Sequence, residues 1–441
     1  MRSNIAFLND FFQSLGAGVR REPQRRKLSR RAASLRLDEA LARIMRPSGE
    51  ASRIAVAGEA LDAFAELDSA GKLAFFHKLL DDYGADAEAI RARYGAWEDE
   101  PSHAHLADLF EAVEPQRQAL LRRLNMAVGG TLQLVRMRAD LLSLMREDQS
   151  LAPLDTDFAH LFASWFNRGF LVMRRIDWNT SAALLEKVVE YEAVHEIQGW
   201  GDLRRRLDPL DRRCYGFFHP ATGDEPLIFV EVALCHGIPD KIAPLLEEGR
   251  AAAGKEADTA VFYSISNCQP GLRGVSFGNY LIKQVARDLA EELPVVKTFV
   301  TLSPAPDFAR WLSEESDEAG RALAAELSGS NWRGDEARVA QLAPLVQSAA
   351  ARYFTEARDK RGAPRDPVAR FHLGNGASAH RVNWPADLAP GALKRAHGLM
   401  INYLYELDAV EERQEAFARD GRIARGPELD KALARRRQPA A

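Results

Sequence analysis

Apolar residues recur at helical spacing through the first 170 residues of the chain. Between residues 72 and 83, five of them fall on one helix stripe: Leu73, Phe76, Leu79, Leu80 and Tyr83. Residues three, four and seven positions apart share a helix face, so this spacing predicts an amphipathic helix. A longer apolar stripe covers residues 114–146, within which Gly129-Gly130 predict a kink or a break. We therefore expect a helical region over about residues 35–170.

Short β-branched and aromatic runs appear after residue 190 and alternate with helical segments. The runs that predict strands cover residues 214–218, 226–234, 260–266 and 295–302. A helical segment at residues 182–191 precedes them, and a second one follows residue 280. Strands mixed with helices indicate an α/β domain. We predict a helical domain over residues 1–180 and an α/β domain over residues 181–441.

Composition narrows the class of protein. The net charge of −4 across 441 residues argues against a nucleic-acid partner, which would need a basic face. Basic runs occur near residues 20–31 and 422–437, and we interpret them as solvated arms. No apolar run approaches the roughly 20 residues that span a bilayer. We expect no membrane association and, without a convincing targeting signal, a cytoplasmic location.

Cysteine and histidine spacing does not indicate a metal site. Cys214, Cys235 and Cys268 are widely separated and form no paired motif, so we expect neither a zinc site nor a disulfide framework. His103 and His105 are two residues apart in a segment that is typical of a solvated helix start. We therefore expect no metal cofactor.

A glycine-rich turn follows the run at residues 260–266 and precedes an amphipathic helix. Such a turn presents unpaired backbone N–H groups at a helix N-terminus, which suits a pyrophosphate. The spacing Arg273-x-x-Ser276-x-Gly278 resembles the acetyl-CoA-binding turn of the GCN5-related acyltransferases, with Ser276 replacing the middle glycine. We take the following as candidate CoA-binding residues: Arg273, Gly274, Ser276, Gly278 and Asn279. An ordinary glycine turn at a helix start is the alternative.

The same turn also matches a second motif. Gly274-Val275-Ser276-Phe277-Gly278 fits Gly-x-Ser-x-Gly, the nucleophile elbow of α/β-hydrolases, which predicts a thioesterase with Ser276 as nucleophile. An elbow turns directly off its strand, however, and residues 267–273 separate Ser276 from the predicted strand. The motif therefore supports hydrolysis less well than it supports CoA binding.

Ser303 and His372 are candidates for the chemistry. Ser303 follows the run at residues 295–302, at the carboxyl end of a predicted strand, where open α/β sheets bind ligands. It could instead cap a helix near Phe308 or form a Ser-Pro turn. His372 lies in a polar, glycine-containing segment that we expect to be a loop. Histidine can donate a proton near pH 7, although a structural hydrogen bond is the commoner use.

Ordered segments across residues 170–408 together resemble the malonyl-CoA decarboxylase family. They cover residues 191–195, 213–215, 262–266, 302–306, 375–377, 381–384 and 398–403. The resemblance implies a helical N-terminal domain used in oligomerisation, and hence a homo-oligomer, either a dimer or a tetramer. It also implies a C-terminal domain of acyltransferase-like fold. That domain would convert malonyl-CoA to acetyl-CoA and CO₂ without a metal or prosthetic group.

The resemblance also assigns site residues. The catalytic serine of the family falls on Ser303, its catalytic histidine on His372, and a further implicated tyrosine on Tyr405. We add Ser266 and Asn375 as substrate-binding or CoA-binding candidates. Position 276 differs from the animal members of the family. Their Gly-Val-Glu-Leu-Gly motif has a glutamate there, whereas this chain has a serine. An acid there cannot be essential if this chain is active.

Decarboxylation leaves a thioester enolate that must be stabilised and protonated. We expect Ser303 to hydrogen-bond the malonyl carboxylate or the enolate, His372 to supply the proton, and Tyr405 to support one of these contacts. Backbone N–H groups near Ser266 would form an oxyanion hole. The alternatives are a CoA-dependent N-acyltransferase, a thioesterase, and a catalytically silent CoA-sensing scaffold.

Overall fold

The computed structural model describes residues 30–46, 49–247, 257–275, 281–314 and 318–434. The chain divides into two compact units. Unit 1 holds the residues up to Val172 together with Phe218–Leu227 and Gln269–Phe277, and unit 2 holds the remainder. Sequence order alone did not associate these two short segments with the helical unit.

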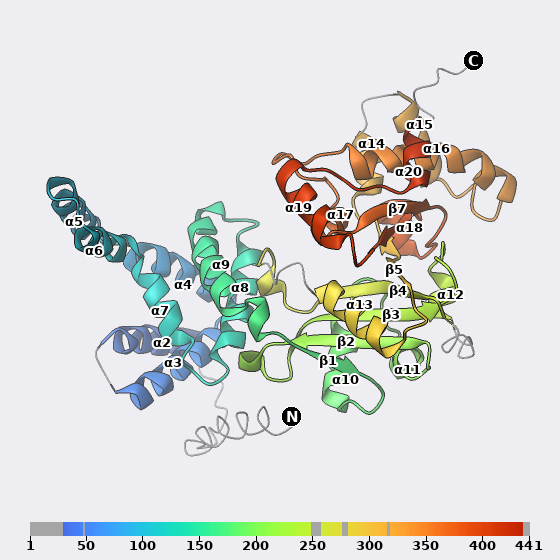
Figure 1. Ribbon diagram of the computed structural model, residues 1–441. Coiled ribbons are helices and arrows are strands. Elements are labelled where there is room, and N and C mark those ends of the chain that lie inside the picture. Colours follow the sequence, from blue (N-terminus) through green and yellow to red (C-terminus); the bar gives the residue numbers. More distant parts are fainter. Residues whose placement is uncertain (1–29, 47–48, 248–256, 276–280, 315–317, 435–441) are drawn as a thin grey trace. The chain divides into compact units, whose positions relative to one another are not determined.

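Unit 1 consists of helices joined by short turns (Figure 1). Its α-helices are α2 (Arg30–Ile44), α3 (Glu50–Ala65), α4 (Ser69–Asp82), α5 (Ala87–Asp99), α6 (His103–Val113), α7 (Gln116–Leu124), α8 (Gly130–Leu144) and α9 (Ala152–Trp165). Short 3₁₀ helices are η1 (Gln149–Leu151), η2 (Arg168–Phe170), η3 (Pro220–Thr222) and η5 (Pro270–Leu272). The side chains of Phe64, Phe75 and Phe76 meet in its core, with ring centroids 5.0–5.8 Å apart. The predicted helical region is confirmed.

The apolar stripe over residues 114–146 is divided between two helices. Helix α7 ends at Leu124 and α8 begins at Gly130. Between them Gly129 adopts a φ of 71°, in the left-handed region that favours glycine. A Cβ on Gly130 would lie 2.7 Å from the backbone oxygen of Leu124, so a side chain there would collide with the preceding helix. The predicted break is confirmed, and both glycines are needed for it.

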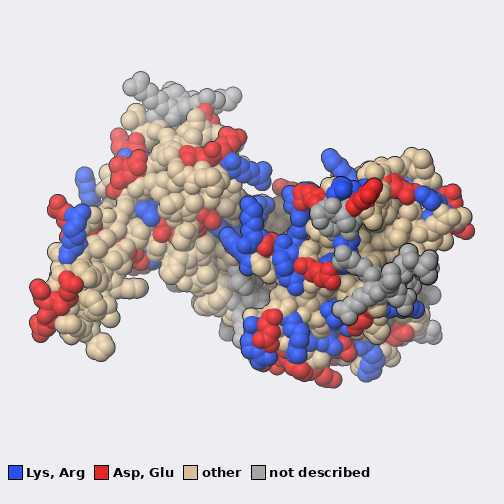
Figure 2. All heavy atoms as spheres, turned by 90° about the horizontal axis from the view of Figure 1, so that it is seen from above, with Lys and Arg blue, Asp and Glu red and all other residues tan. Residues whose placement is uncertain are grey.

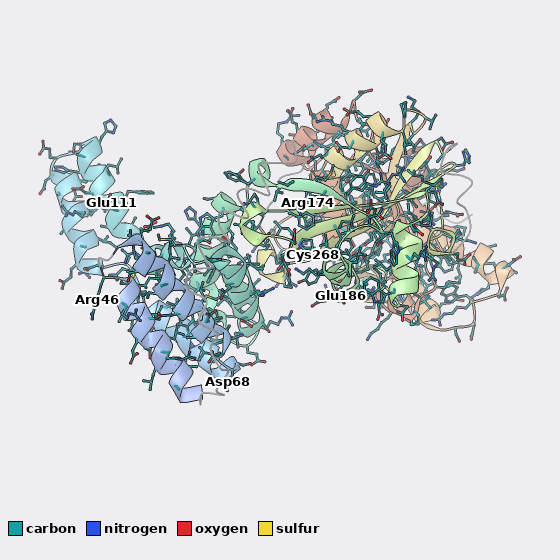
Figure 3. All side chains as sticks on the ribbon, turned by 90° about the horizontal axis from the view of Figure 1, so that it is seen from below. Arg46, Asp68, Glu111, Arg174, Glu186 and Cys268 are labelled. Atoms are coloured by element: carbon teal, nitrogen blue, oxygen red, sulfur yellow. The ribbon has the colours of Figure 1, made fainter. Side chains whose placement is uncertain are left out.

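Helices α5 and α6 form a hairpin that extends from the rest of unit 1, with Glu111 on its second helix (Figures 1 and 3). Neither helix buries a residue against the described part of the chain. Phe110 is 76% exposed and Leu106 is 48% exposed. These two side chains leave an apolar stripe uncovered on the hairpin.

The strands form one mixed sheet, which lies mostly in unit 2. They are β1 (Val172–Ile176), β2 (Arg212–Phe218), β3 (Pro226–Cys235), β4 (Thr259–Asn267), β5 (Thr298–Thr301), β6 (Ser303–Pro304), β7 (Ser378–Asn383) and β8 (Met400–Leu404). The order is β1-β2-β3-β4-β5-β8-β6, with β7 paired to β8. Three predicted strands correspond to β2, β3 and β4. The fourth is shorter than predicted, because Val296 donates its N–H to Leu293 in a turn and the strand begins only at Thr298.

Helices surround this sheet. They are α10 (Ala182–Tyr191), α11 (Trp200–Leu207), α12 (Ala243–Leu246), α13 (Leu281–Glu292), α14 (Phe308–Glu314), α15 (Glu318–Ser328), α16 (Glu336–Thr355), α17 (Pro367–Gly374), α18 (Pro390–Ala396), α19 (Val410–Asp420) and α20 (Pro427–Ala434). Helix α13 lies across one face of the sheet and buries Leu281, Ile282, Val285 and Leu289 (Figure 1). Helices followed by a mixed α/β region confirm the predicted fold class.

The sheet register brings distant parts of unit 2 together. Strands β4 and β5 are parallel and pair Phe262 with Thr301. Strand β6 pairs Ser303 with Ile401 of β8. Tyr405, just after β8, donates its backbone N–H to Phe299 of β5. Strand β8 therefore pairs with both β5 and β6, which brings the segment that holds Ser303 next to the strand that leads to Tyr405.

The surface carries both signs of charge. Figure 2 shows lysine and arginine interspersed with aspartate and glutamate on the visible face. Across the described ranges, no helix combines the length and the apolar character that crossing a membrane requires.

Candidate active site

Ser303 lies in the short strand β6, and not in a helix cap or a Ser-Pro turn. Its Oγ donates a hydrogen bond to Thr301 Oγ1 at 2.8 Å and lies 3.1 Å from His372 Nε2. Thr301 and Ser303 are two residues apart along extended chain, where alternate side chains point to the same side. Pairing of β6 with β8 holds the backbone at Ser303 in place.

His372 occupies the last turn of α17, so the expectation of a loop was wrong. The helix begins because Asp366 accepts the backbone N–H of Ala369 at 2.8 Å and Pro367 occupies its first turn, a position that tolerates proline. Of the two glycines in this segment, Gly374 is the last helical residue and Gly376 lies just after the helix. His372 is 2% exposed, and its imidazole faces the interior of unit 2.

A continuous hydrogen-bonded chain joins the three predicted catalytic side chains. His372 Nε2 contacts Ser303, and His372 Nδ1 lies 2.8 Å from the hydroxyl oxygen of Tyr405. The ring of Tyr403 stacks on the imidazole, with centroids 4.6 Å apart and planes inclined by 24°. All four side chains are buried. The hydroxyl of Tyr403 has no hydrogen-bond partner among the described residues.

Burial fixes the protonation states of His372 and Tyr405. Removal from water disfavours a charged imidazole and lowers the pKa of His372 to about 3. Burial also raises the pKa of Tyr405 well above its ordinary value. At neutral pH the histidine therefore carries one N–H and the tyrosine keeps its proton. Because Ser303 donates to Thr301, we assign this N–H to Nε2, with Ser303 as its acceptor and Tyr405 as donor to Nδ1.

Ser266 belongs to a second buried cluster in unit 2. Its hydroxyl donates to Glu192 Oε2 at 3.1 Å, and the hydroxyl of Ser264 donates to the same oxygen at 2.7 Å. The other carboxylate oxygen of Glu192 accepts the backbone N–H groups of Val194 and His195 at 2.8 and 2.7 Å. Glu192 thereby fixes the loop after α10 against β4. A substrate contact by Ser266 stays a prediction.

Arg273 and Gly274, predicted for CoA binding, lie in a segment of unit 1 that packs on α8. Arg138 of α8 donates to the backbone oxygens of Gly271 and Arg273 at 2.7 and 2.9 Å. A Cβ on Gly271 would lie 1.8 Å from the backbone oxygen of Val135, so only glycine permits this approach. Gly274 adopts a φ of 79°. The first glycine of the turn thus serves packing, and the role of the others in CoA binding stays a prediction.

The remaining CoA-binding candidates are Ser276, Gly278, Asn279 and Asn375. Ser276, Gly278 and Asn279 lie outside the described residues, and with them the nucleophile-elbow hypothesis. Asn375 is buried at the end of α17, where its side-chain amide donates to the backbone oxygen of Phe371 at 2.6 Å. Within the described ranges, no three His, Cys, Asp or Glu side chains gather as a set of metal ligands.

Sequence reasoning did not single out two residues that contact the predicted catalytic side chains. Thr301 accepts the hydrogen bond from Ser303, and Tyr403 stacks on His372. The sequence feature that could have identified them is their spacing, because each lies two residues before a candidate, Ser303 or Tyr405, in extended chain. That spacing alone does not distinguish a contact residue from a core residue.

Comparison with known proteins identifies the family. Sequence models of the malonyl-CoA decarboxylase N-terminal and C-terminal domains match residues 83–166 and 169–441. The mitochondrial malonyl-CoA decarboxylase of Anser anser anser is 33% identical over 391 residues, covering 77% of this chain and 75% of that protein. The crystal structure of malonyl-CoA decarboxylase from Rhodopseudomonas palustris is 47% identical with a TM-score of 0.87, covering 90% of this chain and 99% of that one. The Agrobacterium vitis structure is also 47% identical, with a TM-score of 0.83 over 91% and 99% of the two chains. This chain therefore belongs to the malonyl-CoA decarboxylase family of enzymes.

Proposed function

We propose that this chain converts malonyl-CoA to acetyl-CoA and CO₂ at the site formed by Ser303, His372 and Tyr405. The observation that carries the proposal is the buried hydrogen-bonded chain through these three side chains, with contacts of 3.1 and 2.8 Å. Membership of the family supports the choice of substrate. The alternative of an N-acyltransferase would need a base for an incoming amine, and no observation of the site favours one.

The reaction breaks the bond between the malonyl carboxylate and the adjacent carbon. The electron pair of that bond moves into the thioester to form an enolate, and a proton must then reach the carbon. One proton is consumed in each turnover. Because the thioester itself accepts the electrons, we propose that no metal or prosthetic group is needed. The protein has to stabilise the enolate oxygen and deliver the proton.

Ser303 and His372 divide these tasks in the proposed mechanism. In the proposed bound state the Ser303 hydroxyl turns from Thr301 to orient the malonyl group, and a neutral His372 keeps its Nε2–H directed at the Ser303 oxygen beside that group. A bound carboxylate adds negative charge in a water-poor site, which raises the pKa of His372 and favours uptake of a proton. The charged imidazole then gives its Nε2 proton to the carbon as CO₂ leaves. Tyr405 donates to Nδ1 while the ring is neutral and accepts from it when the ring is charged.

The test is release of labelled CO₂ from malonyl-CoA by the unmodified protein, Ser303→Ala and His372→Asn. Folding is checked by circular dichroism and CoA affinity by calorimetry. We expect turnover in the unmodified protein, at least a hundredfold less in both variants, and little change in CoA affinity. Tyr403→Phe serves as a matched control in the same site. CoA binding without CO₂ release by the unmodified protein would refute the proposal, and free CoA released in its place would indicate a thioesterase.

We also propose that the chain assembles as a homo-oligomer through unit 1. The uncovered stripe of Phe110 and Leu106 on the α5–α6 hairpin supports this, because an exposed apolar helix face commonly marks an interaction surface.

A further inference from the structure

Thr301 is buried beside Ser303 and accepts two hydrogen bonds. Its Oγ1 lies 2.8 Å from Ser303 Oγ, in a geometry in which Ser303 is the donor. The same oxygen accepts the backbone N–H of Tyr403 at 3.1 Å. Thr301 is 0% exposed, so no water competes for these contacts at its surface. The Thr301 oxygen is therefore held by the backbone of β8 and in turn holds the Ser303 proton.

The hydrogen bond between Ser303 and His372 runs in the opposite direction from that between a nucleophilic serine and its base. An activated serine donates its hydroxyl proton to a histidine nitrogen, which accepts it when the serine attacks. Here the single Ser303 proton is directed at Thr301, and His372 Nε2 lies 3.1 Å from the same serine oxygen. The contact to His372 then requires that Nε2 carry the hydrogen. Ser303 is an acceptor toward the histidine and cannot pass its proton to it.

The polarity matters because a CoA substrate offers two reactive positions. A Ser-His pair at 3.1 Å has the spacing of a nucleophile and base that would attack the thioester carbonyl. We propose that Thr301 is a specificity-determining positioning residue, which keeps the Ser303 proton away from His372 and so protects the thioester from hydrolysis. This inference rests on the proposed function, since it concerns how the decarboxylation site avoids a second reaction.

The avoided reaction can be written in full. With no acceptor at position 301, the Ser303 O–H turns to His372 Nε2, and the ring takes the tautomer whose Nδ1–H donates to Tyr405. Ser303 Oγ attacks the thioester carbonyl while Nε2 takes its proton. The carbon–sulfur bond breaks and the CoA sulfur leaves with that proton. Water then hydrolyses the malonyl ester of Ser303, which yields malonate and restores the serine.

Thr301→Val removes the hydroxyl at nearly constant volume, and Thr301→Ser is the matched control that keeps an acceptor. Acetyl-CoA, malonate and free CoA are measured for each variant supplied with malonyl-CoA. We expect the ratio of malonate to acetyl-CoA to rise about tenfold or more in Thr301→Val and to stay unchanged in Thr301→Ser. A malonyl adduct on Ser303, seen by intact-protein mass spectrometry, should appear in the valine variant and vanish when Ser303→Ala is added.

A second measurement does not depend on turnover, and its decisive result comes from the unmodified protein. The ¹⁵N chemical shifts of His372 in the unmodified protein report which ring nitrogen carries the hydrogen. We expect the Nε2–H tautomer in the unmodified protein and in Thr301→Ser. The Nδ1–H tautomer in the unmodified protein would overturn the inference. So would a folded Thr301→Val variant with an unchanged product ratio. Absence of decarboxylation by the unmodified protein would instead refute the proposed function and leave the tautomer result standing.

Discussion

Removal of the Tyr405 hydroxyl is the sharpest test of the hydrogen-bonded chain. Tyr405→Phe deletes a single oxygen, which contacts His372 Nδ1 at 2.8 Å. The phenylalanine ring retains the packing against Phe262 and His372, whose ring centroids lie 6.4 and 6.1 Å from that of Tyr405. The change therefore leaves the shape of the site nearly intact and takes away one donor.

The energetic cost of Tyr405→Phe comes from His372 Nδ1, which loses its hydrogen-bond donor. Nδ1 is a buried acceptor, and a buried polar atom that loses its partner costs about 1 to 3 kcal/mol. The proposed mechanism needs the same hydroxyl to accept Nδ1–H when the imidazole is charged, so the loss grows in the transition state. An extra loss of about 1 to 3 kcal/mol in the transition state, relative to the ground state, corresponds to a kcat about 5- to 150-fold lower. We expect KM to change little, because the hydroxyl orients the histidine and not the CoA portion.

The matched control is Tyr403→Phe. It deletes the same atom from the ring that stacks on His372, but that hydroxyl has no hydrogen-bond partner among the described residues. Loss of an unpartnered buried hydroxyl should be neutral or slightly stabilising, with kcat near that of the unmodified protein. Steady-state CO₂ release and urea unfolding are measured for both variants. Equal losses in the two variants, or no loss in Tyr405→Phe, would contradict the assigned hydrogen-bonded chain.

Two further predictions concern stability. Gly271→Ala places a Cβ 1.8 Å from the backbone oxygen of Val135 and should lower the free energy of unfolding, measured by urea titration, by about 1 to 3 kcal/mol or more. The control is Gly58→Ala in α3, where a Cβ would have no atom within 4 Å, and this change should be neutral or stabilising. Similar effects of the two substitutions would refute the packing role of Gly271. The unfolded chain protonates His372 below its ordinary pKa of 6.5, but the folded chain does so only near 3, so stability should fall by up to about 1.4 kcal/mol per pH unit as the pH drops between these values. The slope should be shallower in His372→Asn, as measured by urea unfolding at a series of pH values, and an unchanged slope would contradict the neutral, buried imidazole.

Elements whose pattern is set by burial were predictable from the sequence. The apolar face of residues 182–191 has helical period, and the helix α10 covers the same residues. Strands β2 and β3 are largely apolar and aromatic because nearly all their residues are buried, with Arg212, Arg213 and Glu231 as the charged exceptions. Glycine at positions 129 and 130 predicted the interruption between α7 and α8, since its conformational freedom is a local property.

Elements with polar sequences were missed for the same physical reason. Strand β7 contains serine, histidine, arginine and asparagine, so no apolar alternation marked it, and its place is decided by pairing with β8. Helix α17 was taken for a loop because one glycine ends it, Gly374, and another, Gly376, comes just after it. Asp366 and Pro367 are residues that commonly start a helix, but they did not by themselves predict one here. The hydrogen bond that Asp366 accepts at the helix start shows that they do so.

The candidate site shows a different limit. The motifs that carry Ser303, His372 and Tyr405 were visible, but His372 lies 69 residues from Ser303 and 33 from Tyr405. Their contact depends on the order of β5, β8 and β6 in the sheet, which no local pattern encodes. The direction of each hydrogen bond depends further on Thr301, whose neighbours had to be known before its role could be inferred.

Burial explains both the state of His372 and why such a site suits decarboxylation. The same exclusion of water that lowers the pKa of His372 to about 3 would act on a malonyl carboxylate placed beside it. A carboxylate loses hydration when it enters, whereas CO₂ is neutral and loses little, so desolvation favours the step that removes the charge. A permanently charged histidine would oppose this by stabilising the carboxylate before the bond breaks. A histidine that is neutral in the resting site takes up its proton only at the cost of its own desolvation, so it offsets less of the desolvation of the carboxylate and still supplies the proton that the enolate needs.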